Sequence, residues 1–135
     1  MADTTPLTRT LQANVAAVAA GADLETKLGE APFAGTVTRV AYVPASTITG
    51  ANTDSRTLQL FNRGAAGSGT TKVAELALTS GVNATADDDK AVTVITASSA
   101  DVVAAGDVLE YKSLHIGSTG LADGGGLVIV EITRS

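Results

Sequence analysis

The chain has 135 residues, a formal net charge of −5 and no cysteine. This length fits one domain with a single core. Without cysteine, a disulfide framework and a thiolate metal site are both excluded. An acidic protein lacks the clustered Lys and Arg that bind DNA phosphates, so we expect no nucleic-acid partner. The Ala-rich run at residues 16–21 is too short to span a bilayer, so we expect no membrane partner.

The first thirty or so residues differ in pattern from the rest of the chain. Leu7, Leu11, Val15 and Val18 recur at spacings of three and four, which is typical of one face of a helix. The Thr and Ala residues between them suit an extended strand equally well, so helix and strand both stay open. Glycines and a proline interrupt the region, and we predict an N-terminal arm over residues 1–32 leading into a domain over residues 33–135. An ordinary first strand is the alternative.

From residue 35 onward, apolar residues recur with a period of two, which is typical of β-strands. The connections between these segments are rich in Gly, Thr, Asn and Asp, which favour turns. The longest connection, at residues 48–55, is expected to be a functional or packing loop. The predicted strands cover residues 36–43, 56–63, 72–79, 91–96, 108–115 and 127–134.

Alternation also predicts which side chains face the core. In the last strand the inward set is Val128, Val130 and Ile132, which leaves Glu131 in solvent. In the strand at residues 72–79, Ala74 and its alternate neighbours share one side, and Val73 is expected on the other.

Short strands without a convincing helix between them predict an all-β fold, namely an antiparallel β-sandwich with the N-terminal arm attached. A parallel sheet would need crossover helices, and the glycine-rich connections form helices poorly. The pattern leaves two sandwich types open, immunoglobulin-like and jelly-roll. Aromatic residues make up only 3% of the chain, so small aliphatic side chains are expected to fill the core.

The sequence offers little catalytic chemistry. His115 is the only histidine, and Ser113 lies two residues away on the same predicted strand face. A contact between these two side chains is conceivable, but neither lies at a strained turn of the kind that exposes a nucleophile. We predict no catalytic residue and a protein that is not an enzyme.

Neither a metal site nor a cofactor site is expected. The acidic run at residues 87–89 could offer oxygen ligands, but it lacks the alternating ligands and the central glycine of an EF-hand, so a solvated turn is the better interpretation. The glycine-rich loops at residues 64–69 and 124–126 are followed by strands, whereas a phosphate loop precedes a helix. We interpret both loops as turns that let backbones approach closely.

Several segments resemble the small head decoration proteins of tailed bacteriophages, particularly those of actinobacterial phages. The resemblance is carried by Ile48-Thr49-Gly50-Ala51-Asn52-Thr53-Asp54-Ser55-Arg56-Thr57-Leu58 and Asn62-Arg63-Gly64. Further matching stretches lie at residues 67–71, 74–83, 104–109, 120–123 and 127–128. It covers about residues 33–134 as a pattern of turns and strands, without a catalytic signature.

The resemblance implies a sandwich on the outer surface of a virion, made in the host cytoplasm, that fastens neighbouring subunits of the major capsid protein. It also implies copies clustered as homotrimers at local three-fold positions. The expected partner contacts lie in the arm and in the loop at residues 48–55. They are Leu7, Leu11, Val15, Val18, Ile48, Thr49, Asn52 and Asp54.

A different function is also open, that of an adhesion module of a head fibre or tail that binds host-surface glycan. Sugar-binding sites commonly stack sugar rings on aromatic side chains. The chain has no Trp, two Tyr and two Phe, so an exposed stacking platform is not expected.

Overall fold

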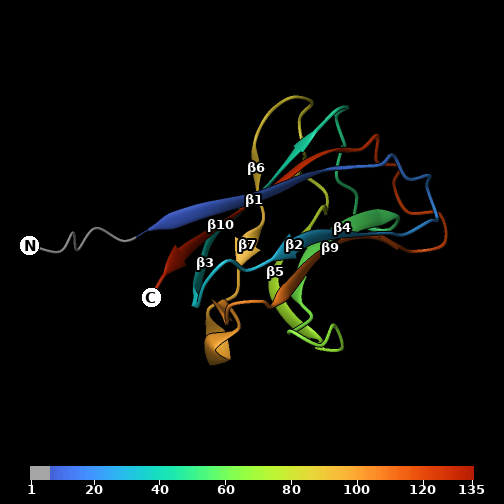
Figure 1. Ribbon diagram of the computed structural model, residues 1–135. Coiled ribbons are helices and arrows are strands. Elements are labelled where there is room, and N and C mark those ends of the chain that lie inside the picture. The colour runs from blue at the N-terminus through green and yellow to red at the C-terminus, as the bar shows by residue number, and fades with distance from the viewer. Residues whose placement is uncertain (1–6) are drawn as a thin grey trace, which may run out of the picture.

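The computed structural model describes residues 7–135 (Figure 1). Within them, no helix is long and apolar enough to cross a membrane. The strands are β1 (Thr8–Val15), β2 (Leu24–Glu30), β3 (Gly35–Pro44), β4 (Ser55–Asn62), β5 (Thr71–Ala77), β6 (Lys90–Ala91), β7 (Thr93–Val94), β8 (Val102–Val103), β9 (Val108–Ile116) and β10 (Gly126–Arg134), with a single 3₁₀ turn, η1 (Ala97–Ser99), before β8.

Two antiparallel sheets form the molecule, which confirms the predicted all-β sandwich. The first sheet has the order β1-β10-β3-β6, with β8 also paired to β3, and the second has the order β2-β9-β4-β5-β7. In Figure 1 the first sheet, with β1, β10 and β3, lies toward the upper left, and the second sheet, with β2, β9, β4 and β5, lies toward the lower right.

The strand pairing is nested, which identifies the jelly-roll topology. β4 pairs with β5, β3 pairs with β6 and β8, β2 pairs with β9, and β1 pairs with β10. The chain is thus one long hairpin wound over both sheets, and strands β1 to β4 alternate between the sheets. This arrangement decides between the two sandwich types in favour of the jelly-roll.

The predicted N-terminal arm is corrected within the described residues. β1 pairs with β10 over its full length and β2 pairs with β9, so the two strands are outer strands of the two sheets. The strand alternative therefore holds. Leu11 and Val15 lie on the inward face of β1, and Thr10, Gln12 and Asn14 are exposed. Two residues four positions apart share a face in a strand as they do in a helix, so the spacing fits both. Residues 1–6 of the predicted arm lie outside the described residues.

One predicted strand, at residues 91–96, is divided between the two sheets. β6 pairs with β3 in the first sheet, whereas β7 pairs with β5 in the second. Val92 lies between them, is 3% exposed, and donates its N–H to the Val40 carbonyl at 2.9 Å. The segment thus closes one side of the sandwich by passing from one sheet to the other.

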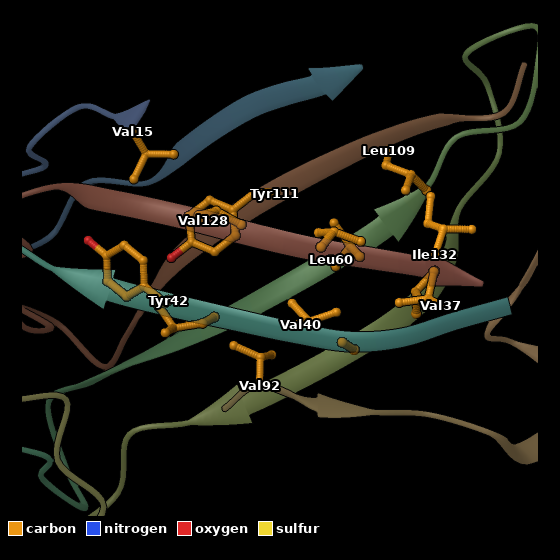
Figure 2. Close-up of a cluster of buried hydrophobic side chains, with 14 of the residues drawn as sticks. Val15, Val37, Val40, Tyr42, Leu60, Val92, Leu109, Tyr111, Val128 and Ile132 are labelled. Atoms are coloured by element: carbon orange, nitrogen blue, oxygen red, sulfur yellow. The ribbon is translucent and has the colours of Figure 1, made fainter. Parts of the chain in front are cut away.

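The core lies between the sheets and consists mainly of small aliphatic side chains, as the composition predicts (Figure 2). The two tyrosines are its aromatic members, with the rings of Tyr42 and Tyr111 stacked at a centroid distance of 5.8 Å. The predicted inward set of the last strand is confirmed, since all three side chains are at most 1% exposed: Val128, Val130 and Ile132.

The predicted outward position of Val73 is wrong. Val73 and Ala74 are consecutive, yet both are fully buried. The β4–β5 register shifts between Leu60 and Phe61, so that Val73 is an extra residue in β5. Such a bulge breaks the alternation of faces, which a period-two pattern cannot anticipate.

The register of β10 can be tested with two neighbouring substitutions. Val130→Asp places an unpaired charge between the sheets, and we expect it to lower the free energy of unfolding by at least about 3 kcal/mol. Glu131 lies on the outer face, where its carboxylate is 3.4 Å from Arg39. Glu131→Thr should therefore change stability by less than about 1 kcal/mol. Urea unfolding measures both, and the opposite ranking would contradict the register.

Candidate binding surface

Four connections meet at one end of the sandwich, which we call the loop end: residues 16–23, 45–54, 78–89 and 117–125. Backbone hydrogen bonds hold them together. Val18 and Asp123 exchange two bonds of 2.7 and 2.9 Å, and Ile48 and Ala84 exchange two of 2.8 and 2.9 Å. The blue loop at residues 16–23 and the orange-red loop at residues 117–125 lie at the right of Figure 1. The loop end is therefore an interlocked unit.

A buried arginine lies beneath the loop end. Arg56 of β4 is 0% exposed, and its guanidinium donates to five acceptors. Nε bonds the Leu121 carbonyl at 2.6 Å, and Nη1 bonds the carbonyl and the hydroxyl of Ser113, both at 3.1 Å. Nη2 bonds the carbonyls of Ala19 and Ala22 at 3.2 and 3.0 Å. Since a guanidinium has five N–H groups, all of them are satisfied, and they tie two loops to strands β4 and β9.

A second buried charge, of opposite sign, belongs to the same network: Asp123, which is 1% exposed. Its carboxylate accepts hydrogen bonds from the Tyr42 hydroxyl at 2.5 Å, from the Gly125 N–H at 2.9 Å and from the Ser113 hydroxyl at 3.4 Å. Burial and the bond to Asp123 raise the pKa of Tyr42, so the phenol stays protonated and donates. Ser113 bonds both charged groups and so connects Arg56 to Asp123.

This polar network was missed by sequence reasoning, although one signal for it was present. Arg56 has the same parity as Leu58 and Leu60 in β4, and both of these leucines are fully buried. The alternation therefore places Arg56 on the inward face. No local pattern identifies Asp123 as the second charge of this network, because the two residues are 67 positions apart in the sequence.

The loop at residues 48–55 is held by its own polar side chains. The Asn52 Oδ1 accepts the Ser80 N–H at 3.0 Å, and the Asp54 Oδ1 accepts the Thr119 N–H at 3.1 Å. Hydrogen bonds from Thr119 above all, and from the backbone of Gly120 and Ser118, lower the pKa of Asp54. The side chains of Asn52 and Asp54 therefore stabilise the conformation of this loop.

The eight predicted contact residues fall into two groups. Leu7 precedes β1, and Leu11 and Val15 belong to β1, whereas the other five lie at the loop end: Val18, Ile48, Thr49, Asn52 and Asp54. Two of the eight are corrected, because Val15 is 6% and Ile48 is 3% exposed, so their side chains fill the core and cannot reach a partner. Thr49 is exposed with no side-chain hydrogen bond among the described residues, and its role as a contact residue stays a prediction.

The conceivable contact between Ser113 and His115 does not form within the described residues. Ser113 is fully buried and bonded to Arg56 and Asp123. The His115 Nδ1 lies 2.6 Å from the Asp23 Oδ1, which also accepts the His115 N–H at 2.8 Å. These bonds lower the pKa of Asp23. The histidine thus fastens the loop at residues 16–23 to the end of β9.

The loop at residues 124–126 lets three strands approach one another, as its glycines predict. Gly125 has φ +82°, and a Cβ on it would lie 2.6 Å from the Val15 carbonyl oxygen. A Cβ on Gly126 would lie 2.2 Å from the Val43 carbonyl oxygen. Only glycine fits at such contacts.

Across residues 7–135 there is no pocket and no group of three potential metal-ligating side chains. Asp89 of the acidic run pairs with Arg39.

Comparison with known proteins gives few matches. No protein-family profile matches the chain, and no curated protein matches it. One solved structure of similar shape is titled "Structure of infectious bursal disease virus Gx strain". It aligns with a TM-score of 0.47 and 11% identity, over 96% of this chain and 32% of that chain. The present chain thus spans about a third of that chain's length, and a similarity at this level carries no information on function.

The buried network predicts a clear order of destabilisation. Arg56→Met leaves four backbone carbonyl groups without their donor, and it leaves the buried Asp123 carboxylate without the positive charge of the network. It should cost about 3–5 kcal/mol of unfolding free energy. Tyr42→Phe removes one hydrogen bond to that carboxylate and should cost about 1–3 kcal/mol. Arg39→Met removes two ion pairs at the surface, with Asp89 and Glu131, and serves as the control, with an expected cost below about 1 kcal/mol. Guanidinium unfolding gives all three values, and equal losses at Arg56 and Arg39 would contradict the role of the network.

The lowered pKa of Asp54 predicts that its contribution to stability depends on pH. A carboxyl whose pKa is lowered by folding adds stability above its ordinary value of 3.8, and this stability is lost as the pH falls through the lower folded value. Asp54→Asn should therefore be less stable than the unsubstituted protein at pH 7, and the difference should shrink toward pH 3. Thermal unfolding at both pH values measures it. A difference that does not change with pH would contradict the argument.

Proposed function

We propose that this protein is a decoration protein of a tailed-phage head, which binds the outer surface of the shell and cements neighbouring major capsid subunits. One observation carries the proposal. Three of the segments that resemble decoration proteins, at residues 48–58, 74–83 and 120–123, are far apart in the sequence but converge at the loop end. Asn52 bonds Ser80, and Arg56 bonds Leu121. A shared binding surface at the loop end would account for the resemblance of these three segments.

The loop end suits binding by shape. Its exposed residues are mostly neutral and small, among them Thr49, Thr53 and Ser80. The buried network and the loop-to-loop hydrogen bonds hold these residues in place before a partner arrives. Less conformational entropy is then lost on binding, which raises the affinity of a modest contact.

Repetition strengthens the proposed contact. A standard interface buries roughly 800 Å² per partner, which is modest for one copy. A copy that bridges two subunits of an assembled shell forms its second contact at high effective concentration.

The role that we propose is structural and not enzymatic, with no cofactor. In keeping with this, the Ser113 hydroxyl and the His115 ring are occupied by bonds that hold the fold. The homotrimeric arrangement implied by the sequence resemblance stays a prediction.

Co-sedimentation with undecorated phage heads tests the proposal. The unsubstituted protein should sediment with the heads, and Thr49→Arg, at the loop end, should reduce the bound fraction at least tenfold by adding bulk and charge to the contact. Ser68→Arg is the matched control. It lies in the exposed connection between β4 and β5, at the opposite end of β4, and should bind normally.

Two outcomes would contradict the proposal. The first is that the unsubstituted protein does not sediment with the heads, and the second is that the two arginine variants bind equally. Deleting residues 1–30 is a poor test, because the deletion would remove β1 and β2, one outer strand from each sheet.

A further inference from the structure

The two sheets have four edges, and three of them carry features that block the addition of another strand. β6, β7 and β8 are two residues long each. β2 has a register shift between Lys27 and Gly29, and Lys27 forms an ion pair with Glu110. Short strands, bulges and lysines are the means by which proteins protect sheet edges from pairing with other chains.

Among the described residues, the β1 edge has none of this protection. β1 is eight residues long, and its register with β10 continues from Thr8 to Val15 without a shift. It contains no proline, glycine or lysine, and Arg9 is its only charged residue. A long regular edge strand of this kind is a template for strand addition.

The hydrogen bonds between β1 and β10 identify the main-chain groups of β1 that have no partner within residues 7–135. The Arg134 N–H donates to the Leu7 carbonyl at 2.8 Å, so these residues form a hydrogen-bonded pair. Such pairs alternate along antiparallel strands, and therefore the odd-numbered residues of β1 direct their N–H and C=O groups at β10. The even-numbered residues direct theirs away from β10. They are all exposed, and we call them the open edge: Thr8, Thr10, Gln12 and Asn14.

We propose that the open edge pairs with the open edge of a second copy, antiparallel, around a two-fold axis at Leu11. Thr8 then lies opposite Asn14 of the other copy, and Thr10 lies opposite Gln12. In this register every residue of the open edge donates one hydrogen bond and accepts one. If the two strands shift by two residues, part of each open edge has no partner. If they shift by one residue, the unpaired N–H and C=O groups of one copy lie opposite groups of the other copy that already bond to β10.

The side chains agree with this register. Leu11 lies opposite Leu11 of the other copy in a non-hydrogen-bonded pair, where side chains come closest, and such apolar pairs stabilise sheets. Arg9 lies opposite Ala13. The Arg9 residues of the two copies are then four positions apart, roughly 13 Å at the rise of a strand, which exceeds the screening length at physiological salt. The pairing joins the two β1-containing sheets into one sheet across the dimer.

Cysteine crosslinking tests both the partner and the register, and the chain has no native cysteine to interfere. In the proposed dimer, Leu11→Cys brings two thiols together across the axis, within the Cα separation that a disulfide needs. We expect a disulfide-linked dimer of twice 13.4 kDa under oxidising conditions at high protein concentration. Gln12→Cys is the control, because its counterpart in the second copy is Thr10, and it should crosslink at least tenfold less. Equal crosslinking of the two variants would overturn the register.

A second measurement tests the interface without a covalent bond. Light scattering at high protein concentration should give the mass of a dimer for the unsubstituted protein. The double variant T10K/Q12K places like charges opposite each other on the outer face and should give the mass of a monomer. The control T93K/T96K adds the same charge at exposed positions away from β1 and should stay dimeric.

The outcomes separate this inference from the proposed function, since the measurement uses the free protein without phage heads. An unsubstituted protein that is monomeric at every concentration would overturn the inference, and so would a trimer or a T10K/Q12K variant that stays dimeric. Circular dichroism of both lysine variants shows that they remain folded, so a loss of mass reports on the interface.

Discussion

The architecture depends on a pair of opposite charges enclosed between the sheets. Arg56 and Asp123 are both almost completely inaccessible to solvent, and neither could stay charged there without partners. Arg56 belongs to β4, and the partners of the two charges come from β3 and β9 and from the loops at residues 16–23 and 117–125. The charges are therefore satisfied only when five parts of the chain are in their native places. This requirement links the position of the loops to the folding of the core.

The same constraint separates two kinds of surface on the molecule. At the loop end, polar side chains such as Asn52 and Asp54 are used up in bonds between loops, and small neutral side chains are presented on a rigid support. Along β1 the arrangement is the reverse, because the main chain itself has hydrogen-bonding groups without a partner within residues 7–135. The first surface suits recognition by shape, and the second suits pairing with another strand. They lie on different parts of the sandwich, so both could be occupied at once.

Local pattern was sufficient where residues interact with their immediate neighbours. Alternation located β3, β4, β5, β9 and β10 to within two residues, and it assigned Val128, Val130 and Ile132 to the core. It failed at Val73 and at Val92, where a bulge and a change of sheet interrupt the period. It also left β1 ambiguous, because residues four apart share a face in a helix and in a strand alike. These positions are decided by the strands that pair with them.

The sequence by itself determined the class of the fold, the aliphatic nature of the core and the places of the turns, because these follow from side-chain size, periodicity and backbone preference. Only the tertiary structure decided the jelly-roll order, the connection of Arg56 to Asp123 through Ser113 and the exposure of the β1 edge. Each of these is a relation between distant parts of the chain. The free energy of such a relation comes from burial and hydrogen bonding across the fold, which no stretch of neighbouring residues encodes.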